Sequence, residues 1–86
     1  MKRSRLEIFL DVLKAIDGGT RKPTRIMYRT NVPYMSLMKI LDSMADQGLI
    51  AVKRTNGRSV YSTTEKGRNA LAYFDRAFEI IEIKRK

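Results

Sequence analysis

The sequence contains neither cysteine nor histidine, and both absences restrict its chemistry. Without cysteine the chain can form no disulfide and offers no thiolate, as expected of a protein in the reducing interior of a cell. Without histidine it also lacks the usual zinc ligands and the commonest general base of enzymes. We therefore expect no metal site, no cofactor and no catalytic residues.

Acidic residues are scarce as well. The 86 residues include 18 lysines and arginines against 9 aspartates and glutamates, which gives a formal net charge of +9. Such a balance favours a polyanionic partner, with nucleic acid first and an anionic membrane surface second. An enzyme would need paired carboxylates in a pocket, whereas these acids are scattered over polar faces, so an ordinary metabolic enzyme is not expected.

Long apolar runs and low-complexity tracts are also missing. No segment approaches the ~18 consecutive apolar residues that a membrane span needs. The basic start, Met1 to Arg5, resembles that of a signal peptide, but Glu7 and Asp11 interrupt the apolar residues after it and no small-residue cleavage site is present. Apolar residues make up 43%, enough for a modest core, so we expect one continuous domain that stays inside the cell.

Two helices are predicted in the first third of the chain. Ser4-Arg5-Leu6-Glu7 has the spacing of a capping box, and apolar residues at helical intervals come after it, which predicts a helix over residues 5–17. Gly18-Gly19 supplies its left-handed stop. Proline fits the first turn of a helix, so a short second helix begins at Pro23 and must end before Asn31-Val32-Pro33.

A third helix begins at Pro33 in the same way and stops at Gly48. Its apolar face is formed by Tyr34, Leu37, Met38, Leu41, Met44 and Ala45, and its opposite face by Ser36, Lys39, Ser43 and Gln47. The period then changes: residues 49–55 and 58–63 are strand-like, and Asn56-Gly57 between them is the strongest short-range signal for a β-hairpin. Thr63 or Thr64 caps a last helix that runs to about Ile83.

This order of elements is that of a winged helix-turn-helix. The fold class we predict is α+β and mostly helical, with three helices, a β-hairpin wing and a long C-terminal helix. In such folds the second helix of the helix-turn-helix, here the third helix of the chain, enters the major groove of DNA.

Four segments also carry a resemblance: Ser4-Arg5-Leu6-Glu7-Ile8, the run from Lys22 to Asn31 around Pro23-Thr24-Arg25-Ile26-Met27-Tyr28, Gly48-Leu49-Ile50, and Tyr61-x-x-Thr64-Glu65-Lys66-Gly67. Over residues 4 to about 74 the chain resembles an archaeal winged-helix family. The family includes small ten-kilodalton chromatin-associated proteins and predicted transcriptional regulators. The resemblance implies double-stranded DNA binding by a dimer joined through an antiparallel C-terminal coiled coil, with a final helix shorter here than in the chromatin members.

The third helix offers few residues for reading bases. Its outward side chains can bond bases or phosphates, and the candidates are Tyr34, Ser36, Lys39 and Ser43. It carries one lysine against Asp42 and Asp46, a poor electrostatic footprint for base reading by basic side chains. We therefore expect modest sequence specificity.

Positive charge is concentrated on the two elements that flank this helix. One acid-free stretch, from Thr20 to Thr30, contains Arg21, Lys22, Arg25 and Arg29, and the hairpin tip carries Lys53, Arg54 and Arg58. We predict phosphate contacts for both clusters, because such contacts give affinity and orientation without sequence information. The alternative is an ordinary solvated charged face.

The last helix carries two apolar rows. Leu71, Phe74, Phe78 and Ile81 follow the alternation of a coiled coil, and Ala70, Tyr73, Ala77 and Ile80 run beside them. Together the rows are wider than the ~100° stripe that one core contact requires. We assign Leu71, Phe74, Phe78 and Ile81 to a dimer interface; the alternative is a helix buried wholly in its own domain. Residues 1–66 are then the DNA-binding domain and residues 67–86 a dimerisation helix continuous with it.

These features predict a homodimer that binds double-stranded DNA in a sequence-tolerant or modestly specific manner. Transcriptional regulation and chromatin architecture both fit, in the cytoplasm and associated with the nucleoid. The alternative is a protein-interaction module that does not read DNA. RNA binding is a third option, disfavoured because no exposed aromatic platform for stacking is expected. The sequence alone shows no small-molecule ligand and no membrane contact.

Overall fold

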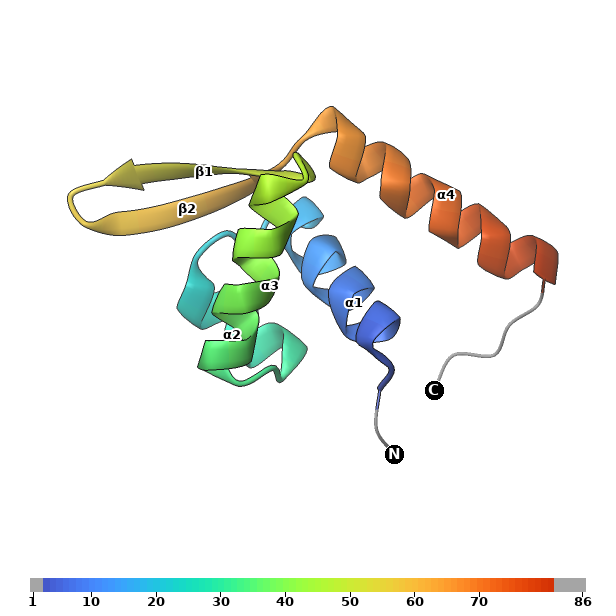
Figure 1. Cartoon of the computed structure of the whole chain (residues 1–86), viewed down its shortest axis with the longest axis horizontal. Helices are drawn as coiled ribbons and strands as arrows, with labels where there is room; N and C mark the ends of the chain where they lie inside the picture. Colours follow the sequence, from blue (N-terminus) through green and yellow to red (C-terminus); the bar gives the residue numbers. More distant parts are fainter. Residues whose placement is uncertain (1–2, 82–86) are drawn as a thin grey trace.

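Four helices and one β-hairpin make up residues 3–81, the part of the chain that the computed structural model describes. In chain order they are α1 (Arg5–Asp17), α2 (Pro23–Thr30), α3 (Tyr34–Asp46), β1 (Ile50–Thr55), β2 (Arg58–Thr63) and α4 (Glu65–Ile81) (Figure 1). This confirms the predicted elements and their order. The predicted end of the last helix at Ile83 lies outside the described residues.

The ends of the helices follow the local chemistry of the sequence. Ser4 Oγ accepts a hydrogen bond from the backbone N–H of Glu7 at 3.1 Å, and Glu7 Oε1 accepts one from the N–H of Ser4 at 2.9 Å, so the capping box is present. The chain leaves α1 through Gly19, which has a φ of +104°, a conformation that favours glycine. Asn31 ends α2 with a φ of 58°, which leaves a short turn before α3.

The hairpin closes as the Asn-Gly pair predicts. Asn56 and Gly57 have φ values of 52° and 75°, the two positive angles that a tight two-residue hairpin turn needs. The two strands pair from Ile50 with Thr63 to Thr55 with Arg58. The hairpin, β1 with β2, is called the wing below. Its residues 51–58 are exposed, so its distal part extends away from the helices (Figure 1).

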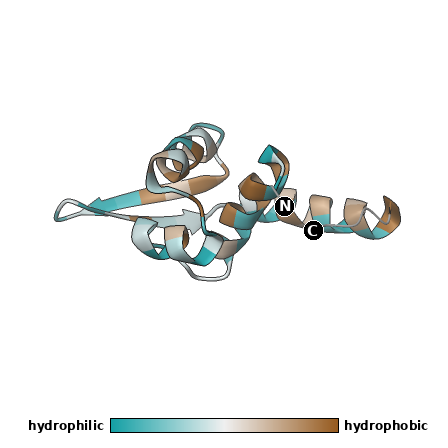
Figure 2. Ribbon diagram, turned by 90° about the horizontal axis from the view of Figure 1, so that it is seen from below, coloured by the Kyte–Doolittle hydropathy of each residue, from teal (hydrophilic) through white to brown (hydrophobic). Residues whose placement is uncertain are grey.

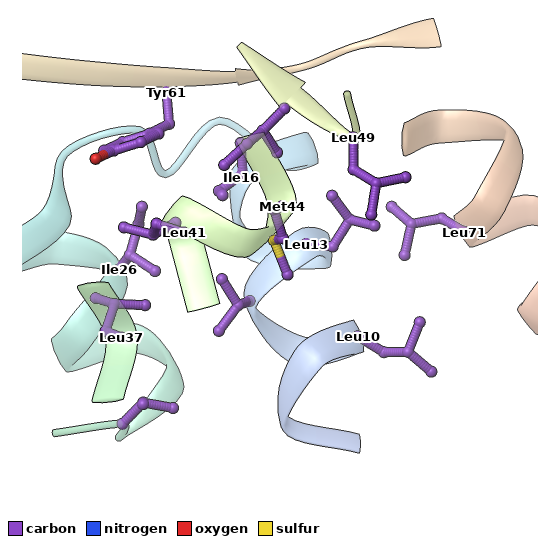
Figure 3. Close-up of a cluster of buried hydrophobic side chains, with 13 residues drawn as sticks. Leu10, Leu13, Ile16, Ile26, Leu37, Leu41, Met44, Leu49, Tyr61 and Leu71 are labelled. Carbon is purple, nitrogen blue, oxygen red and sulfur yellow. The ribbon is translucent and has the colours of Figure 1, made fainter. Parts of the chain in front are cut away.

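One hydrophobic core holds all of these elements together, and every helix contributes to it (Figure 3). The base of the hairpin closes it with Leu49, Ile50 and Tyr61. Burying one large apolar side chain is worth ~1.5–3 kcal/mol, so these contacts supply most of the stability of so small a domain. The fully buried side chains are Leu10, Val12, Leu13, Ile16, Ile26, Leu37, Leu41 and Met44.

Helix α4 is fixed to the end of α3 by a close backbone approach. Thr64 Oγ1 donates a hydrogen bond to the carbonyl of Gly48 at 2.6 Å and accepts one from the N–H of Gly67 at 3.1 Å. Lys66 Nζ donates to the carbonyl of Gln47 at 2.6 Å. A Cβ at Gly67 would collide with the carbonyl oxygen of Leu49, so only glycine allows this contact.

Candidate nucleic-acid interface

Helix α3 turns one face to the core and the opposite face to solvent. Leu37, Leu41 and Met44 are 0% exposed. The residues on the opposite side of the helix, including Met35 and Lys39, are exposed, and Met35 leaves 73% of its surface free. The four candidates predicted on this helix are all exposed, namely Tyr34, Ser36, Lys39 and Ser43. The helix is therefore free to enter a groove of DNA along this face.

Two large side chains, Tyr34 and Met35, are exposed at the first turn of α3. Met35 was assigned to neither face of the helix from the sequence pattern, and it stands where recognition helices contact base edges. Helical spacing predicts the exposure of Met35, because Met35 lies about 200° around the helix axis from the buried Leu37. Tyr34, placed on the apolar face by the sequence pattern, is 48% exposed.

A hollow of about 400 Å³ separates α3 from the wing. Tyr34 and Met38 line it from α3, Lys22 and Thr24 from the start of α2, and Arg58 from the wing. The fold therefore brings together three of the predicted DNA-binding residues, each from a different element. A phosphate strand crossing this hollow would meet a cation on both sides, which is the arrangement that backbone contacts require.

The basic cluster of α2, predicted as one patch, is divided by the structure. Arg21, Lys22, Arg25 and Arg29 are all exposed. Arg25 and Arg29 line a hollow of about 620 Å³ together with Tyr28 and the loop before α2. Within the described part of the chain, α3 contributes no residue to this hollow. Lys22, at the start of α2, instead lines the hollow between α3 and the wing. The helical period separates these side chains although they are close in sequence.

Two exposed tyrosines, Tyr28 and Tyr34, lie on different surfaces of the predicted DNA-binding domain, where the sequence predicted no aromatic platform for stacking. Tyr28 is 77% exposed and lines the hollow beside Arg25, whereas Tyr34 lines the hollow beside the wing. These two rings belong to different surfaces, so they do not form the continuous platform on which single-stranded RNA stacks.

The wing presents its charges on both sides. Lys53, Arg54 and Arg58 are exposed, as predicted. Successive side chains of a strand alternate, and Arg54 is opposite Ser59 on the side of the buried Tyr61, whereas Lys53 faces the other way. The wing therefore offers cations to a strand approaching from either side.

Tyr61 ties the hairpin to the loop before α2. It is 2% exposed, and its backbone N–H donates to the carbonyl of Arg21 at 2.9 Å. Burial, together with the nearby carboxylate of Asp42, raises the pKa of Tyr61, although a hydrogen bond with Ser59 and the charge of Arg54 act in the opposite direction. The phenol is therefore neutral near pH 7 and serves as a structural anchor.

Two basic residues that the sequence pattern did not assign also lie beside α3. Arg3 and Arg5 line a groove between α1 and α3 together with Ser36, Lys39 and Ser43. Arg3 is held in place, because its guanidinium pairs with Asp11 at 3.0 Å and also donates to the carbonyl of Asn31 at 3.3 Å. The signal was the basic start of the chain, which first suggested the beginning of a signal peptide.

The geometry is matched by a family comparison. A sequence model described as winged helix-turn-helix matches residues 2–82, which is nearly the whole chain. The chain belongs to the winged helix-turn-helix family. Its α2 and α3 are the helix-turn-helix, and β1 with β2 is the wing.

Proteins similar to this winged helix include two from archaea and one from STIV. An uncharacterized protein of Methanocaldococcus jannaschii, MJ0287, is 29% identical over 83 residues, which cover 96% of this chain and 81% of that protein. The crystal structure of Sso10a-2, a DNA-binding protein from Sulfolobus solfataricus, is 28% identical with a TM-score of 0.79, covering 93% of this chain and 83% of that one. F93 from STIV, a winged-helix DNA-binding protein, shares the fold with 17% identity and a TM-score of 0.74, covering 99% of this chain and 100% of that one.

The four residues predicted for the dimer interface are buried to different extents in the last helix of this winged helix. Leu71 is 6% exposed and belongs to the domain's own core. Phe74 and Phe78, with ring centroids 6.4 Å apart, are partly buried and pack against the same core. Of the predicted row only Ile81 is well exposed, at 62%. The boundary predicted at residue 67 therefore falls within a helix whose first turns are part of the domain.

Two large residues of the neighbouring row of α4 face solvent. Tyr73 is 79% exposed and Ile80 is 71% exposed. Figure 2 shows the hydrophobic end of α4 extending beyond the rest of the domain. We call Tyr73, Ile80 and Ile81 the α4 face. None of the helices within residues 3–81 is long and apolar enough to cross a membrane.

Proposed function

We propose that this protein binds double-stranded DNA as a homodimer, by occupancy and without chemistry of its own. The observation that carries the proposal is the exposed face of α3 with cations on the two elements beside it, Lys22 at the start of α2 and Arg58 on the wing. Sso10a-2, which is 28% identical, is described as a DNA-binding protein. In this arrangement α3 enters the major groove and the flanking cations contact phosphates.

The chemistry of α3 supports modest rather than strict sequence specificity. Lys39 is its one basic residue, and the carboxylates of Asp42 and Asp46 lie on the same exposed side. Carboxylates repel phosphates and accept hydrogen bonds only from groups such as the amino group of cytosine. Most of the affinity then comes from phosphate contacts, which fits either a regulator or a chromatin-architectural protein located at the nucleoid.

The α4 face supports dimerisation. Three large side chains of α4, Tyr73 in its middle and Ile80 and Ile81 at its end, are left exposed. A second copy related by two-fold symmetry presents the same residues, so each helix covers the apolar surface of the other. Two recognition helices then meet one duplex, which raises affinity without any new contact in either domain.

Salt titration of binding to duplex DNA, duplex RNA and unrelated DNA sequences tests the proposal. Each lost phosphate contact should reduce the slope of log K against log salt by roughly 0.9. We expect Lys22→Gln and Arg58→Gln to reduce the slope and to weaken binding to all DNA sequences similarly. Arg68→Gln, which removes the same charge from α4, is the matched control and should leave the slope unchanged.

Three results would refute the proposal. The first is a wild-type protein that binds acidic protein but no duplex. The second is a stronger affinity for duplex RNA than for duplex DNA. The third is a slope that stays unchanged when Lys22 and Arg58 are neutralised together.

A further inference from the structure

The groove between α1 and α3 has the size of a small-molecule site. Its volume is about 520 Å³, within the range of roughly 300–1,000 Å³ typical of ligand pockets. Its apolar lining comes from Ile8 and Phe9 of α1, Ile40 of α3, and Val32 and Pro33 of the turn between α2 and α3. Ile8, Phe9 and Ile40 are only partly buried, so apolar surface remains open to the groove.

The rim of this groove is positively charged. Arg3, Arg5 and Lys39 line it together with the hydroxyls of Ser36 and Ser43, and no carboxylate is among the lining residues within the described part of the chain. The charge of Arg3 is already paired with Asp11. Arg5 and Lys39 make no ion pair within residues 3–81, so their charges are available to an anion.

Apolar surface beside uncompensated cations selects for a particular ligand chemistry. A phosphate of DNA needs the cations but gains nothing from Ile8, Phe9 and Ile40, because its oxygens cannot replace water on an apolar surface. A neutral apolar molecule covers that surface but leaves the cations unused. A ligand with an apolar body and one carboxylate satisfies both parts of the groove.

We propose that this groove binds a small amphipathic carboxylate and that the bound ligand weakens DNA binding. The carboxylate lies at Arg5 and Lys39, and the ring or chain lies on Ile8, Phe9 and Ile40. Lys39 belongs to the exposed face of α3, so one cation cannot serve the ligand and DNA at the same time. This coupling rests on the proposed DNA binding, whereas ligand binding by itself does not.

A fluorescence titration with 2-naphthoate tests the ligand site. We expect saturable binding with a dissociation constant on the order of 0.1–1 mM, as for a ligand of so few atoms. The neutral analogue 2-naphthylmethanol and the short carboxylate acetate should each bind at least ~10-fold more weakly. Backbone amide shifts in a ¹⁵N–¹H spectrum should map 2-naphthoate to residues 8, 9, 32 and 40.

Charge removal at the rim supplies the matched comparison. Arg5→Gln with Lys39→Gln should weaken 2-naphthoate by at least ~10-fold and leave 2-naphthylmethanol unaffected. The control, Arg68→Gln with Arg76→Gln, removes the same charge from α4 and should leave both probes unaffected. An equal loss of 2-naphthoate affinity in the two double variants would mean non-specific attraction and would overturn the site. Binding that does not saturate by 10 mM 2-naphthoate, roughly ten times the weakest expected dissociation constant, would also overturn it.

The proposed weakening of DNA binding by the ligand is measured separately. At ten times its dissociation constant, 2-naphthoate should lower the affinity for duplex DNA by about 10-fold relative to the same concentration of sodium acetate. The Arg5→Gln, Lys39→Gln variant should show no such loss. Ligand binding with unchanged DNA affinity would refute the coupling. A protein that binds 2-naphthoate but never DNA would refute the proposed function and leave the ligand site standing.

Discussion

Replacing Ile80 by lysine should separate the two chains of the proposed dimer. Ile80 exposes 71% of its surface in the single chain. Burying a complete isoleucine side chain is worth ~1.5–3 kcal/mol, so covering the exposed part contributes about 1–2 kcal/mol per chain. Two-fold symmetry doubles this to about 4 kcal/mol at most, which corresponds to a rise of about 30- to 1,000-fold in the dimer dissociation constant.

Sedimentation equilibrium between one and one hundred times the wild-type dissociation constant measures this shift. Ala72→Lys is the control, because Ala72 is also exposed on α4 but lies about 80° around the helix from Ile80. The control should remain dimeric, and the far-UV spectrum of Ile80→Lys should stay that of the wild type because Ile80 lies outside the core. Leu71→Ala provides the contrast, since it should cost ~2–5 kcal/mol of stability.

The reasoning fails if the wild-type chain sediments as a monomer at concentrations of tens of micromolar. It fails equally if Ala72→Lys dissociates the dimer as strongly as Ile80→Lys, because the α4 face would then not be the surface in contact.

Gly67→Ala should lower the melting temperature markedly, because its Cβ would collide with the carbonyl of Leu49 and force α4 away from the hairpin. The control variant is Gly57→Ala at the exposed turn, where the added Cβ meets no atom within 4 Å and only the backbone strain of the turn lowers stability. Met35→Ala should reduce the preference for sites with thymine methyl groups, measured with duplexes in which uracil replaces thymine; equal loss on both duplexes would assign Met35 no role in reading bases. The raised pKa of Tyr61 means that the folded state holds its proton more tightly than the unfolded state. Its contribution to stability is complete below about pH 10, the unfolded value, and is lost as the pH rises through the folded pKa, so the melting temperature should fall there more for the wild type than for a Phe variant of Tyr61.

The elements were predictable because their signals are local. The capping box at Ser4, the proline at the start of α2 and the Asn56-Gly57 turn each depend on a few neighbouring residues, and the structure has each where the sequence predicts it. The same applies to the exposure of Lys39 and Arg58, which follows from helical and strand periodicity.

The surfaces were harder to predict because they depend on how the elements dock. Both rows of α4 are apolar, and periodicity alone does not show which one faces inward. The contact of Gly67 with Leu49 sets the rotation of the helix, and this turns Leu71 into the core and Ile80 to solvent. The groove beside Lys39 likewise combines two segments that are distant in the sequence, residues 3–9 and residues 31–43.

Thr64 and Lys66 donate hydrogen bonds to the carbonyls of Gly48 and Gln47, just after α3. These bonds fix the angle between the recognition helix and α4. In a dimer paired through α4, the distance between the two recognition helices is then set by where the two α4 helices cross. Sliding one helix past the other by a single turn changes that distance by about 5 Å, against the ~34 Å that separates successive major grooves on one side of a duplex. The apolar residues of the α4 face thus determine the spacing between the two DNA half-sites. A substitution that shifts the register of the α4 pairing selects a different spacing without changing any residue that contacts DNA.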